Sequence, residues 1–454
     1  MVVRLQDVGK AVRRTEYAVR GPIVARAREL ELEGREIVYC NIGNPQALGQ
    51  KPLTWIRQVL ALVEYPELID RCGKGTFPPD VVETARLVVK ESKHGLGAYT
   101  ESKGMRFVRQ AVAEFIEERD GIKADPERVY LTDGASKGVQ TILRILISDE
   151  CDGVMIPIPQ YPLYSATITL LGGRQVQYYL EEESGWKLSR SMLEKSYERA
   201  RAEGISVRGL CVINPGNPTG AVLDVKNIEM VIDFAREYGL AILADEVYQE
   251  NVYHPGDEFH SFAKVLECMG AKDISLFSFH SCSKGFLGEC GHRGGYVECR
   301  NVPQDVLDEI TKLQSVALCA NSVGQIVTYL MVRPPKPGDP SHELYVKERD
   351  GIVDELRLRA KIVAERLNAV PGISCQLVAG AMYAFPKVTL PPNSTDFEYC
   401  LKLLEQTGIC VVPGSGFGQV PGTFHFRTTI LPPTDKIESV VKGIADFHVR
   451  FTKE

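Results

Sequence analysis

The sequence predicts an α/β protein whose larger part contains a mostly parallel sheet flanked by helices. Apolar runs such as 209–213 and 240–244 lack the alternation of a half-exposed strand, which is typical of strands buried on both faces. From about residue 61, such runs alternate with helical patterns, as in a sheet whose strands are joined by helices. With 454 residues, the chain is long enough for two or three folding units.

Composition narrows the classes of function. Hydrophobic residues make up 44% and charged residues 25% of the chain, as in ordinary globular proteins. The net charge of −6 argues against nucleic acid as a main partner, and no apolar run reaches the roughly 18 residues of a membrane-spanning helix. None of the 12 cysteines forms a C-x-x-C pair or has zinc-ligand spacing. We therefore expect no metal site and a cytoplasmic protein with reduced thiols, or a mitochondrial one if a presequence has been removed.

Residues 1–60 are interpreted as an N-terminal arm and part of a smaller domain. The segment 17–22 leads into a helix over 23–33, and a short strand over 36–40 ends in a turn that contains Gly43. Glycine in such a turn lets the backbone approach a ligand closely, although a plain turn at the end of a strand is an equally good interpretation.

Residues 61–332 are interpreted as the large domain, and two of its turns have features of a ligand site. The strand 128–132 is followed by small residues at 133–138 and then by an apolar helix. Free amides at such a helix start bind phosphate, although an ordinary capped helix shows the same pattern. Tyr161 lies between two prolines at the end of another strand, where its ring can stack on a planar cofactor or simply pack.

Two more strands of this domain end in polar turns. The strand 209–213 runs into a dense turn, after which Asp224 caps a helix that ends at Gly239. The strand 240–244 ends in Asp245. Open α/β sheets place ligand-binding groups at the carboxyl ends of their strands, whereas most acids at strand ends are only solvated or cap a helix. We expect these turns to converge at one edge of the sheet.

The site is predicted around the stretch that follows the strand-like run 274–277. It combines Ser281, Lys284 and Arg293 with small residues and glycines. A nucleophilic lysine needs a shielded pocket, because desolvation lowers the pKa of an amine and frees its lone pair. Serine and arginine are donors that hold phosphate. A lysine beside a phosphate site indicates pyridoxal phosphate bound as a Schiff base, while a solvated surface charge is the ordinary role of a lysine.

Residues 333–454 are interpreted as a smaller α+β domain. A proline-rich loop at 333–340 precedes a long charged helix over about 348–368. Strands and a helix follow, over 380–388, 397–407, 409–412 and 423–429. Arg427 lies in the last strand between aromatic residues, where a half-buried guanidinium needs an anionic partner. A substrate carboxylate would serve, although the residue alone favours a structural salt bridge.

With these residues in view, the chain resembles the fold-type I, class I and II aminotransferases that use pyridoxal 5′-phosphate. The resemblance covers nearly the whole chain and rests on four motifs in family order: Asn-Pro-x-Asn-Pro-Thr-Gly (214–220), Asp-Glu-Val-Tyr (245–248), Ser-x-Ser-Lys-Gly-x-x-Gly-Glu-x-Gly-x-Arg-Gly-Gly-Tyr (281–296) and Phe-x-Phe-Arg (424–427). Within this family it is most similar to the alanine aminotransferases, through segments at 41–46, 97–100, 333–340, 380–383 and 414–419.

The resemblance implies an aspartate-aminotransferase-like large domain with a seven-stranded sheet, and a role for each candidate residue. Lys284 would form the aldimine with the cofactor and shuttle the proton, with Asp245 at the pyridine nitrogen and Tyr248 and Asn217 at the phenolic oxygen. The ring face would meet Tyr161. The phosphate would be held by Ala135, Ser136, Ser281, Arg293 and, from a second subunit, Tyr99, which makes a homodimer part of the site. Arg427, assisted by Gly43 and Asn217, would bind the substrate α-carboxylate.

The function implied is a ping-pong transamination from L-alanine to 2-oxoglutarate, which gives pyruvate and L-glutamate. A glutamate–glyoxylate or other amino-acid aminotransferase of the same fold is the first alternative, and a lyase would need different control of which Cα bond breaks. A non-catalytic ligand-binding module is a distant alternative, because it would not need both Lys284 and Asp245. Cys282 and Cys290 are expected to be packing residues.

Overall fold

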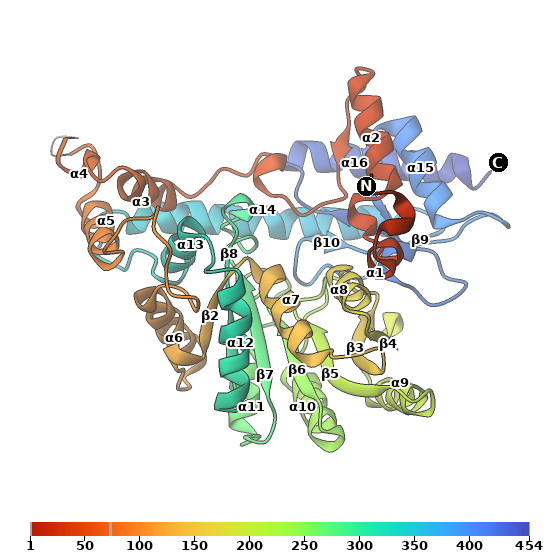
Figure 1. Ribbon diagram of the computed structural model, residues 1–454. Coiled ribbons are helices and arrows are strands. Elements are labelled where there is room, and N and C mark those ends of the chain that lie inside the picture. The colour runs from red at the N-terminus through yellow and green to blue at the C-terminus, as the bar shows by residue number, and fades with distance from the viewer. Residues whose placement is uncertain (1, 72–74, 454) are drawn as a thin grey trace.

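A seven-stranded sheet forms the centre of the protein in a computed structural model that describes residues 2–71 and 75–453 (Figure 1). The strands lie in the order β2-β8-β7-β6-β5-β3-β4. Their bounds are β2 (Val129–Asp133), β3 (Asp152–Ile158), β4 (Arg174–Tyr179), β5 (Ser206–Ile213), β6 (Ala241–Asp245), β7 (Leu276–Ser281) and β8 (Gly294–Arg300). Only β8 runs antiparallel to its neighbours, β2 and β7. The predicted fold class, with its mostly parallel sheet, is confirmed.

Helices cover both faces of this sheet, which explains why its strands show no alternation. One face is covered by α7 (Ala135–Leu146), α8 (Leu163–Leu171) and α12 (Gln304–Val316). The other face is covered by α9 (Arg190–Ala202), α10 (Val225–Tyr238) and α11 (Phe262–Cys268). Within β6, Leu243 belongs to the first core, whereas Ile242 and Ala244 belong to the second. Successive side chains point to opposite faces of the sheet. Because helices cover both faces, the side chains on each face are apolar.

The predicted limits of α10 illustrate how local chemistry sets an element. The Asp224 carboxylate accepts a hydrogen bond from the Asn227 amide at 2.9 Å, and Gly239 closes the helix with a φ of 65°. Both ends therefore lie where the sequence predicts them.

The segment before β2 differs from the prediction. Strands were expected to alternate with helices from residue 61, but the described residues between 54 and 128 form helices without strands: α3 (Thr54–Glu64), α4 (Leu68–Arg71), α5 (Pro79–Glu91) and α6 (Arg106–Asp120). Val81, Ala85 and Val88 of α5 are fully buried and recur at helical spacing. These helices form one core with α13 (Ser322–Val332) and with one face of β2.

The two ends of the chain meet in a second unit. Its helices are α2 (Pro22–Leu32), the C-terminal part of α14 (His342–Asn368), α15 (Asp396–Thr407) and α16 (Thr434–Phe451). Its strands are short: β1 (Val38–Tyr39) pairs with β12 (Ile409–Cys410), β9 (Ile373–Ser374) with β11 (Lys387–Val388), and β14 (Phe426–Thr429) lies between β10 (Tyr383–Ala384) and β13 (Val412–Pro413). In Figure 1, both termini lie beside these elements.

The helix α14 connects the two units. It begins at His342, earlier than the predicted 348, and its 27 residues span about 40 Å. Tyr345 near its start packs into the core of α3 and α13, whereas Leu356 and Val363 pack into the C-terminal core. The predicted domain boundary at residue 60 falls inside α3 and that at 332 coincides with the end of α13. The division into domains itself stays a prediction. None of the helices in the described ranges is both long and apolar enough to cross a bilayer.

Candidate active site

A cavity of about 820 Å³ opens where the carboxyl ends of β5, β6 and β7 face the C-terminal unit. The last residues of these strands, Ile213, Asp245 and Ser281, contribute to its wall. The structure brings to this cavity every predicted site residue except Tyr99: Gly43, Ala135, Ser136, Tyr161, Asn217, Asp245, Tyr248, Ser281, Lys284, Arg293 and Arg427. The convergence expected from the turns is therefore present, while the role of each residue stays a prediction.

Lys284 lies half-buried in the cavity and faces the N-terminal segment. Its Nζ donates a hydrogen bond to the Gly43 carbonyl oxygen at 2.6 Å. A side chain at position 43 would collide with the Tyr383 hydroxyl and would come within 3.2 Å of the lysine amine. Glycine is therefore required at this position by close approach, as the turn suggested.

Asp245 at the end of β6 is a buried carboxyl group with one strong donor. The residue is only 4% exposed, and its carboxylate accepts a hydrogen bond from the Tyr164 hydroxyl on α8 at 3.0 Å. Burial raises the pKa of Asp245 to about 6, against the opposing effects of the Tyr164 hydrogen bond and the Lys284 charge. Sequence reasoning missed Tyr164. The only signal was its spacing, one helical turn after Tyr161.

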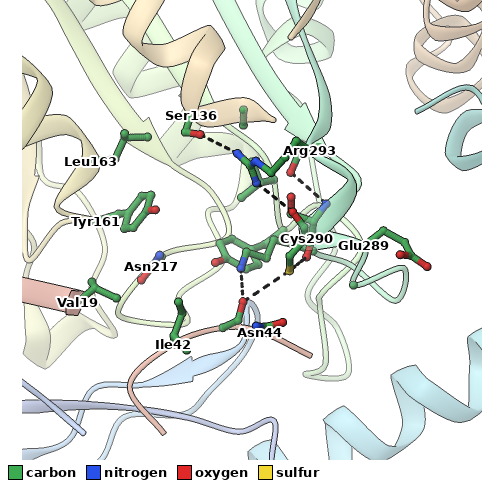
Figure 2. Close-up of a pocket in the computed structure, with 18 of the residues that line it drawn as sticks. Val19, Ile42, Asn44, Ser136, Tyr161, Leu163, Asn217, Glu289, Cys290 and Arg293 are labelled. Carbon is green, nitrogen blue, oxygen red and sulfur yellow. Dashed lines mark hydrogen bonds between the residues drawn. The ribbon is translucent and has the colours of Figure 1, made fainter. Parts of the chain in front are cut away.

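An anion site lies at the start of α7, which follows directly on β2. The N-cap residue Gly134 has a φ of 74° and offers no capping side chain, so the first amides of α7 remain available. The Arg293 guanidinium donates to Ser136 Oγ at 3.0 Å (Figure 2). It also donates to the Asp133 carbonyl oxygen at 3.0 Å. Among the described residues no carboxylate pairs with Arg293. A side chain at position 134 would collide with its guanidinium.

Arg427 on β14 is only 1% exposed, and several contacts hold its guanidinium in place. Its Nη1 donates to Asn217 Oδ1 at 3.0 Å, and its Nη2 donates to the Asn41 carbonyl oxygen. The Tyr383 and Phe417 rings lie on it, with centroids 4.0 and 4.5 Å from its central carbon. Its Nε is buried without a hydrogen-bond partner, and no ion pair forms with any carboxylate of residues 2–71 and 75–453. The alternative of a structural salt bridge is therefore wrong for the described part of the chain.

Tyrosines make up much of the remaining wall. The Tyr161 hydroxyl lies 2.9 Å from that of Tyr17, and the Tyr248 and Tyr383 rings meet edge to face at 6.2 Å. Burial raises the pKa of Tyr161 and Tyr248 well above the ordinary value. Burial alone would raise the pKa of Tyr383 too, but the charges of Lys284 and Arg427 lower it. Tyr17 and Tyr383 are further residues to which sequence reasoning gave no role.

Two expectations concern residues around this wall. Tyr99 lies outside the cavity and is 79% exposed, so a single chain does not bring it to the anion site. Cys282 is buried, and its thiol faces the Glu289 and Gly294 carbonyl oxygens, whereas Cys290 lines the cavity.

Comparison with known proteins agrees with this geometry. The sequence pattern of the family described as "Aminotransferase class I and II" matches residues 71–444. A probable mitochondrial alanine aminotransferase of Dictyostelium discoideum is 51% identical, over 98% of this chain and 89% of its own length. Alanine aminotransferase 1 of Homo sapiens is 49% identical, over 100% and 96%. Glutamate–glyoxylate aminotransferase 2 of Arabidopsis thaliana is 47% identical, over 99% and 96%.

Solved structures give the same result. An alanine aminotransferase from Pyrococcus furiosus superposes with a TM-score of 0.80 at 27% identity, over 98% of this chain and 100% of that one. An aspartate aminotransferase from Thermus thermophilus superposes with a TM-score of 0.76 at 18% identity, over 97% and 99%, which shows the fold alone. The chain is thus a member of the class I and II aminotransferases, the family of transferases that work with pyridoxal 5′-phosphate.

Proposed function

We propose that this aminotransferase transfers the amino group of L-alanine to 2-oxoglutarate and releases pyruvate and L-glutamate in a ping-pong sequence. The observation that carries the proposal is a buried arginine without a carboxylate partner among the described residues, Arg427, in the same cavity as the Lys284 amine. An amino acid needs both groups, one for its carboxylate and one for proton transfer at its Cα. The alanine aminotransferases at about half identity support alanine as the donor.

The cavity fits pyridoxal 5′-phosphate in two respects. The open start of α7 and the Arg293 guanidinium, which no described acid neutralises, suit a phosphate. The buried Asp245 carboxyl has a raised pKa and suits a cationic ring nitrogen, which would restore its charge. When bound, the cofactor supplies a carbonyl that condenses with amines and a ring that withdraws electrons. The residues that would hold it are Ala135, Ser136, Tyr161, Asn217, Asp245, Tyr248, Ser281, Lys284 and Arg293.

The side chains in the cavity would then have separate roles in the reaction. Arg427 binds the α-carboxylate and, with Asn217 and Gly43, orients the Cα–H bond toward the lysine. Lys284 would take the proton from the substrate Cα as a general base, and its protonated amine would give that proton back as a general acid. The Asp245 carboxylate would pair with the ring nitrogen and favour its protonated form. The aromatic residues around Arg427 exclude water from the carboxylate bond, which strengthens it.

Spectroscopy of the purified holoenzyme tests the proposal. Addition of L-alanine is expected to shift the cofactor absorbance, and 2-oxoglutarate is expected to restore it. Borohydride reduction before substrate addition should fix the cofactor on the peptide that contains Lys284, and Lys284→Ala should abolish both this labelling and the shift. Absence of a shift with alanine would reject alanine as donor, and a label on another lysine would reject the site.

A second candidate is transamination between glutamate and glyoxylate. The Arabidopsis thaliana relative that bears this name is 47% identical over almost the entire chain. The two activities share glutamate but differ in the oxo acid, so a panel of pyruvate, 2-oxoglutarate and glyoxylate separates them. A kcat/KM for glyoxylate above that for pyruvate would favour the second candidate.

We also infer a homodimer with shared active sites, in which Tyr99 reaches the phosphate site of the other subunit. The exposure of Tyr99 in one chain supports this arrangement. For location we propose the cytoplasm, with mitochondria as the alternative that the names of the Dictyostelium discoideum and Arabidopsis thaliana relatives favour. Cell fractionation with an antibody against the chain separates the two.

A further inference from the structure

Asn251 is a fully buried amide that contacts the residue next to Lys284. It lies in the segment that follows β6. Its Oδ1 accepts a hydrogen bond from the Gly285 amide at 2.9 Å, and its Nδ2 donates to the Gly285 carbonyl oxygen at 3.5 Å. One side chain therefore binds both backbone polar groups of Gly285. The chain directly after Lys284 is thereby held by a residue 34 positions from Gly285.

The same side chain also connects to the C-terminal unit. Asn251 Nδ2 donates to the Tyr253 hydroxyl at 3.0 Å, and this hydroxyl donates to the Ala381 carbonyl oxygen at 2.7 Å. The Ala381 amide donates to the Asn251 carbonyl oxygen at 3.0 Å. Tyr253 and Ala381 are both buried. The loss of one partner would therefore leave a buried polar group without a hydrogen bond.

These bonds hold Ala381 in a left-handed backbone conformation, with a φ of 58°. Such a conformation is unfavourable for a residue with a side chain, so the surrounding structure must maintain it. Both polar backbone groups of Ala381 are bound, the amide by Asn251 and the carbonyl oxygen by Tyr253. Tyr383 follows two positions later, at the start of β10. The conformation of Ala381 therefore sets the direction in which Tyr383 enters the cavity.

Tyr383 lies between the two groups that the proposed reaction requires. Its ring covers Arg427, with the ring centroid 4.0 Å from the central guanidinium carbon. Its hydroxyl and the Lys284 amine both border Gly43, because a side chain added there would meet both. A continuous series of bonds and contacts thus joins the lysine to the arginine: Lys284, Gly285, Asn251, Tyr253, Ala381, Tyr383 and Arg427. Asn251 and Tyr253 themselves lie outside the lining of the cavity.

We propose that Asn251 is a positioning residue that sets the placement of the Lys284 amine relative to the Arg427 guanidinium. This inference rests on the proposed function, in which the two groups act on the same amino acid. The rate of proton transfer depends steeply on the placement of the base, and a displacement of about 1 Å can lower it about 100-fold. Asn251 acts through the backbone of Gly285 on one side and of Ala381 on the other. It therefore influences the reaction without contact with the substrate.

Two variants separate the two sides of this connection. Asn251→Ala removes the side-chain contacts with both Gly285 and Tyr253, whereas Tyr253→Phe removes only the hydrogen bonds of the hydroxyl. In the Asn251→Ala holoenzyme, kcat for alanine should fall about 10–100-fold. The deuterium isotope effect on kcat with Cα-deuterated alanine should rise, because proton transfer becomes slower than the other steps. In Tyr253→Phe, KM for alanine should rise about 2–10-fold while the isotope effect stays unchanged.

Asn368→Ala is the matched control. Asn368 in α14 also accepts a hydrogen bond from one backbone amide, that of Cys375 at 2.9 Å. It donates to the carbonyl oxygens of Ala364 and Cys375 at 3.0 and 2.7 Å, within the C-terminal unit and outside the lining of the cavity. This variant should lose stability but keep the wild-type kcat, KM and isotope effect. If the two alanine variants changed kcat and the isotope effect alike, the role of Asn251 would be structural only.

Hydrogen exchange of the cofactor-free protein gives a readout that does not depend on the reaction. Relative to β3, the amides of 285–288 and 381–384 should exchange faster in Asn251→Ala, only those of 381–384 in Tyr253→Phe, and neither set in Asn368→Ala. Unchanged exchange at 285–288 in Asn251→Ala, or a wild-type isotope effect in that variant, would overturn the positioning role. If the wild-type enzyme transfers no amino group from alanine, the proposed function fails, and the exchange comparison still decides whether Asn251 holds the two segments.

Discussion

At the scale of single residues, Arg427, the residue proposed to bind the α-carboxylate, is already held in place by the chain itself. Two rings fix the plane of its guanidinium, and Asn217 and the Asn41 carbonyl oxygen fix its rotation. A group that is ordered in advance loses little entropy on binding, so more of the interaction energy appears as affinity.

The variant Arg427→Lys tests this arrangement. Lysine keeps the charge but loses the planar fork and its stacking, which costs about 1.5–3 kcal/mol in binding the α-carboxylate. KM for every amino-acid donor should therefore rise by one to two orders of magnitude, while the cofactor absorbance stays. Steady-state kinetics with alanine and glutamate measure the change, and an unchanged KM for both would contradict the proposed contact.

Asp245 should make the cofactor-free protein less stable at neutral pH. Its folded pKa of about 6 lies above its ordinary value of 3.8, so the folded state binds more protons than the unfolded state between these values. The free energy of unfolding therefore falls as pH rises through this window, by on the order of 2–3 kcal/mol. Asp245→Asn should remove this decrease in the free energy of unfolding. Thermal unfolding of the apoprotein at pH 4.5 and pH 8 should show a gain for the variant mainly at pH 8.

Asp152 provides a control of opposite sign. Burial would raise its pKa, but hydrogen bonds from Ser148 and the Arg208 ion pair outweigh this effect and lower it to about 2. The stabilisation by Asp152 is present above about pH 4 and is lost as pH falls toward 2. Asp152→Asn should thus destabilise the apoprotein at pH 8. If both variants moved stability in the same direction, burial would not be the cause at Asp245.

At the scale of elements, the start of α7 combines a glycine at positive φ with a close contact. Gly134→Ala would place a methyl group against the Arg293 guanidinium at a left-handed φ of 74°. We expect a loss of stability of about 1–3 kcal/mol and a weaker affinity for the cofactor, because Arg293 must move. Thermal unfolding and equilibrium titration of the apoprotein with the cofactor measure the two effects.

The variant Gly121→Ala separates the effect of backbone strain from the effect of the contact with Arg293. Gly121 closes α6 with a φ of 70°, and an added methyl group there would meet open space. Gly121→Ala should cost about 1–2 kcal/mol of stability and leave cofactor affinity unchanged. Equal effects of both variants on cofactor affinity would show that backbone strain, not the contact with Arg293, controls binding.

At the scale of the whole molecule, the homodimer is the prediction with the widest consequences. Tyr99→Ala should weaken cofactor affinity without changing the thermal unfolding of the apoprotein at matched subunit concentration, because the ring is 79% exposed in one chain. Tyr99→Phe should show how much of the loss belongs to the hydroxyl. Sedimentation should give twice the chain mass of 50.3 kDa for the holoenzyme. A holoenzyme that is monomeric and active would refute the shared site.

The parts that sequence could predict were those set by local chemistry. The apolar strands, the capped ends of α10, the turns before Ala135 and Lys284, and the end of a strand at Asp245 each follow from neighbouring residues. Helices α3, α4 and α5 were missed because short apolar patterns fit strand and helix alike until their packing partners are known. Tyr164 was missed because its partner is 81 positions away.

The position of Arg427 also fixes an order of events during synthesis. Every residue proposed to hold the phosphate within one chain has been synthesised once Arg293 is made. Arg427 follows near the end of the chain, and its acceptor, the Asn41 carbonyl oxygen, lies 386 positions earlier. Chains emerge N-terminus first and fold in units as they do so. The residues proposed to bind the phosphate are thus all made before Arg427, the residue proposed to bind the amino acid. In the proposed assignment, amino-acid binding therefore depends on a contact between Arg427 and the Asn41 carbonyl oxygen that can form only after nearly the whole chain has been made.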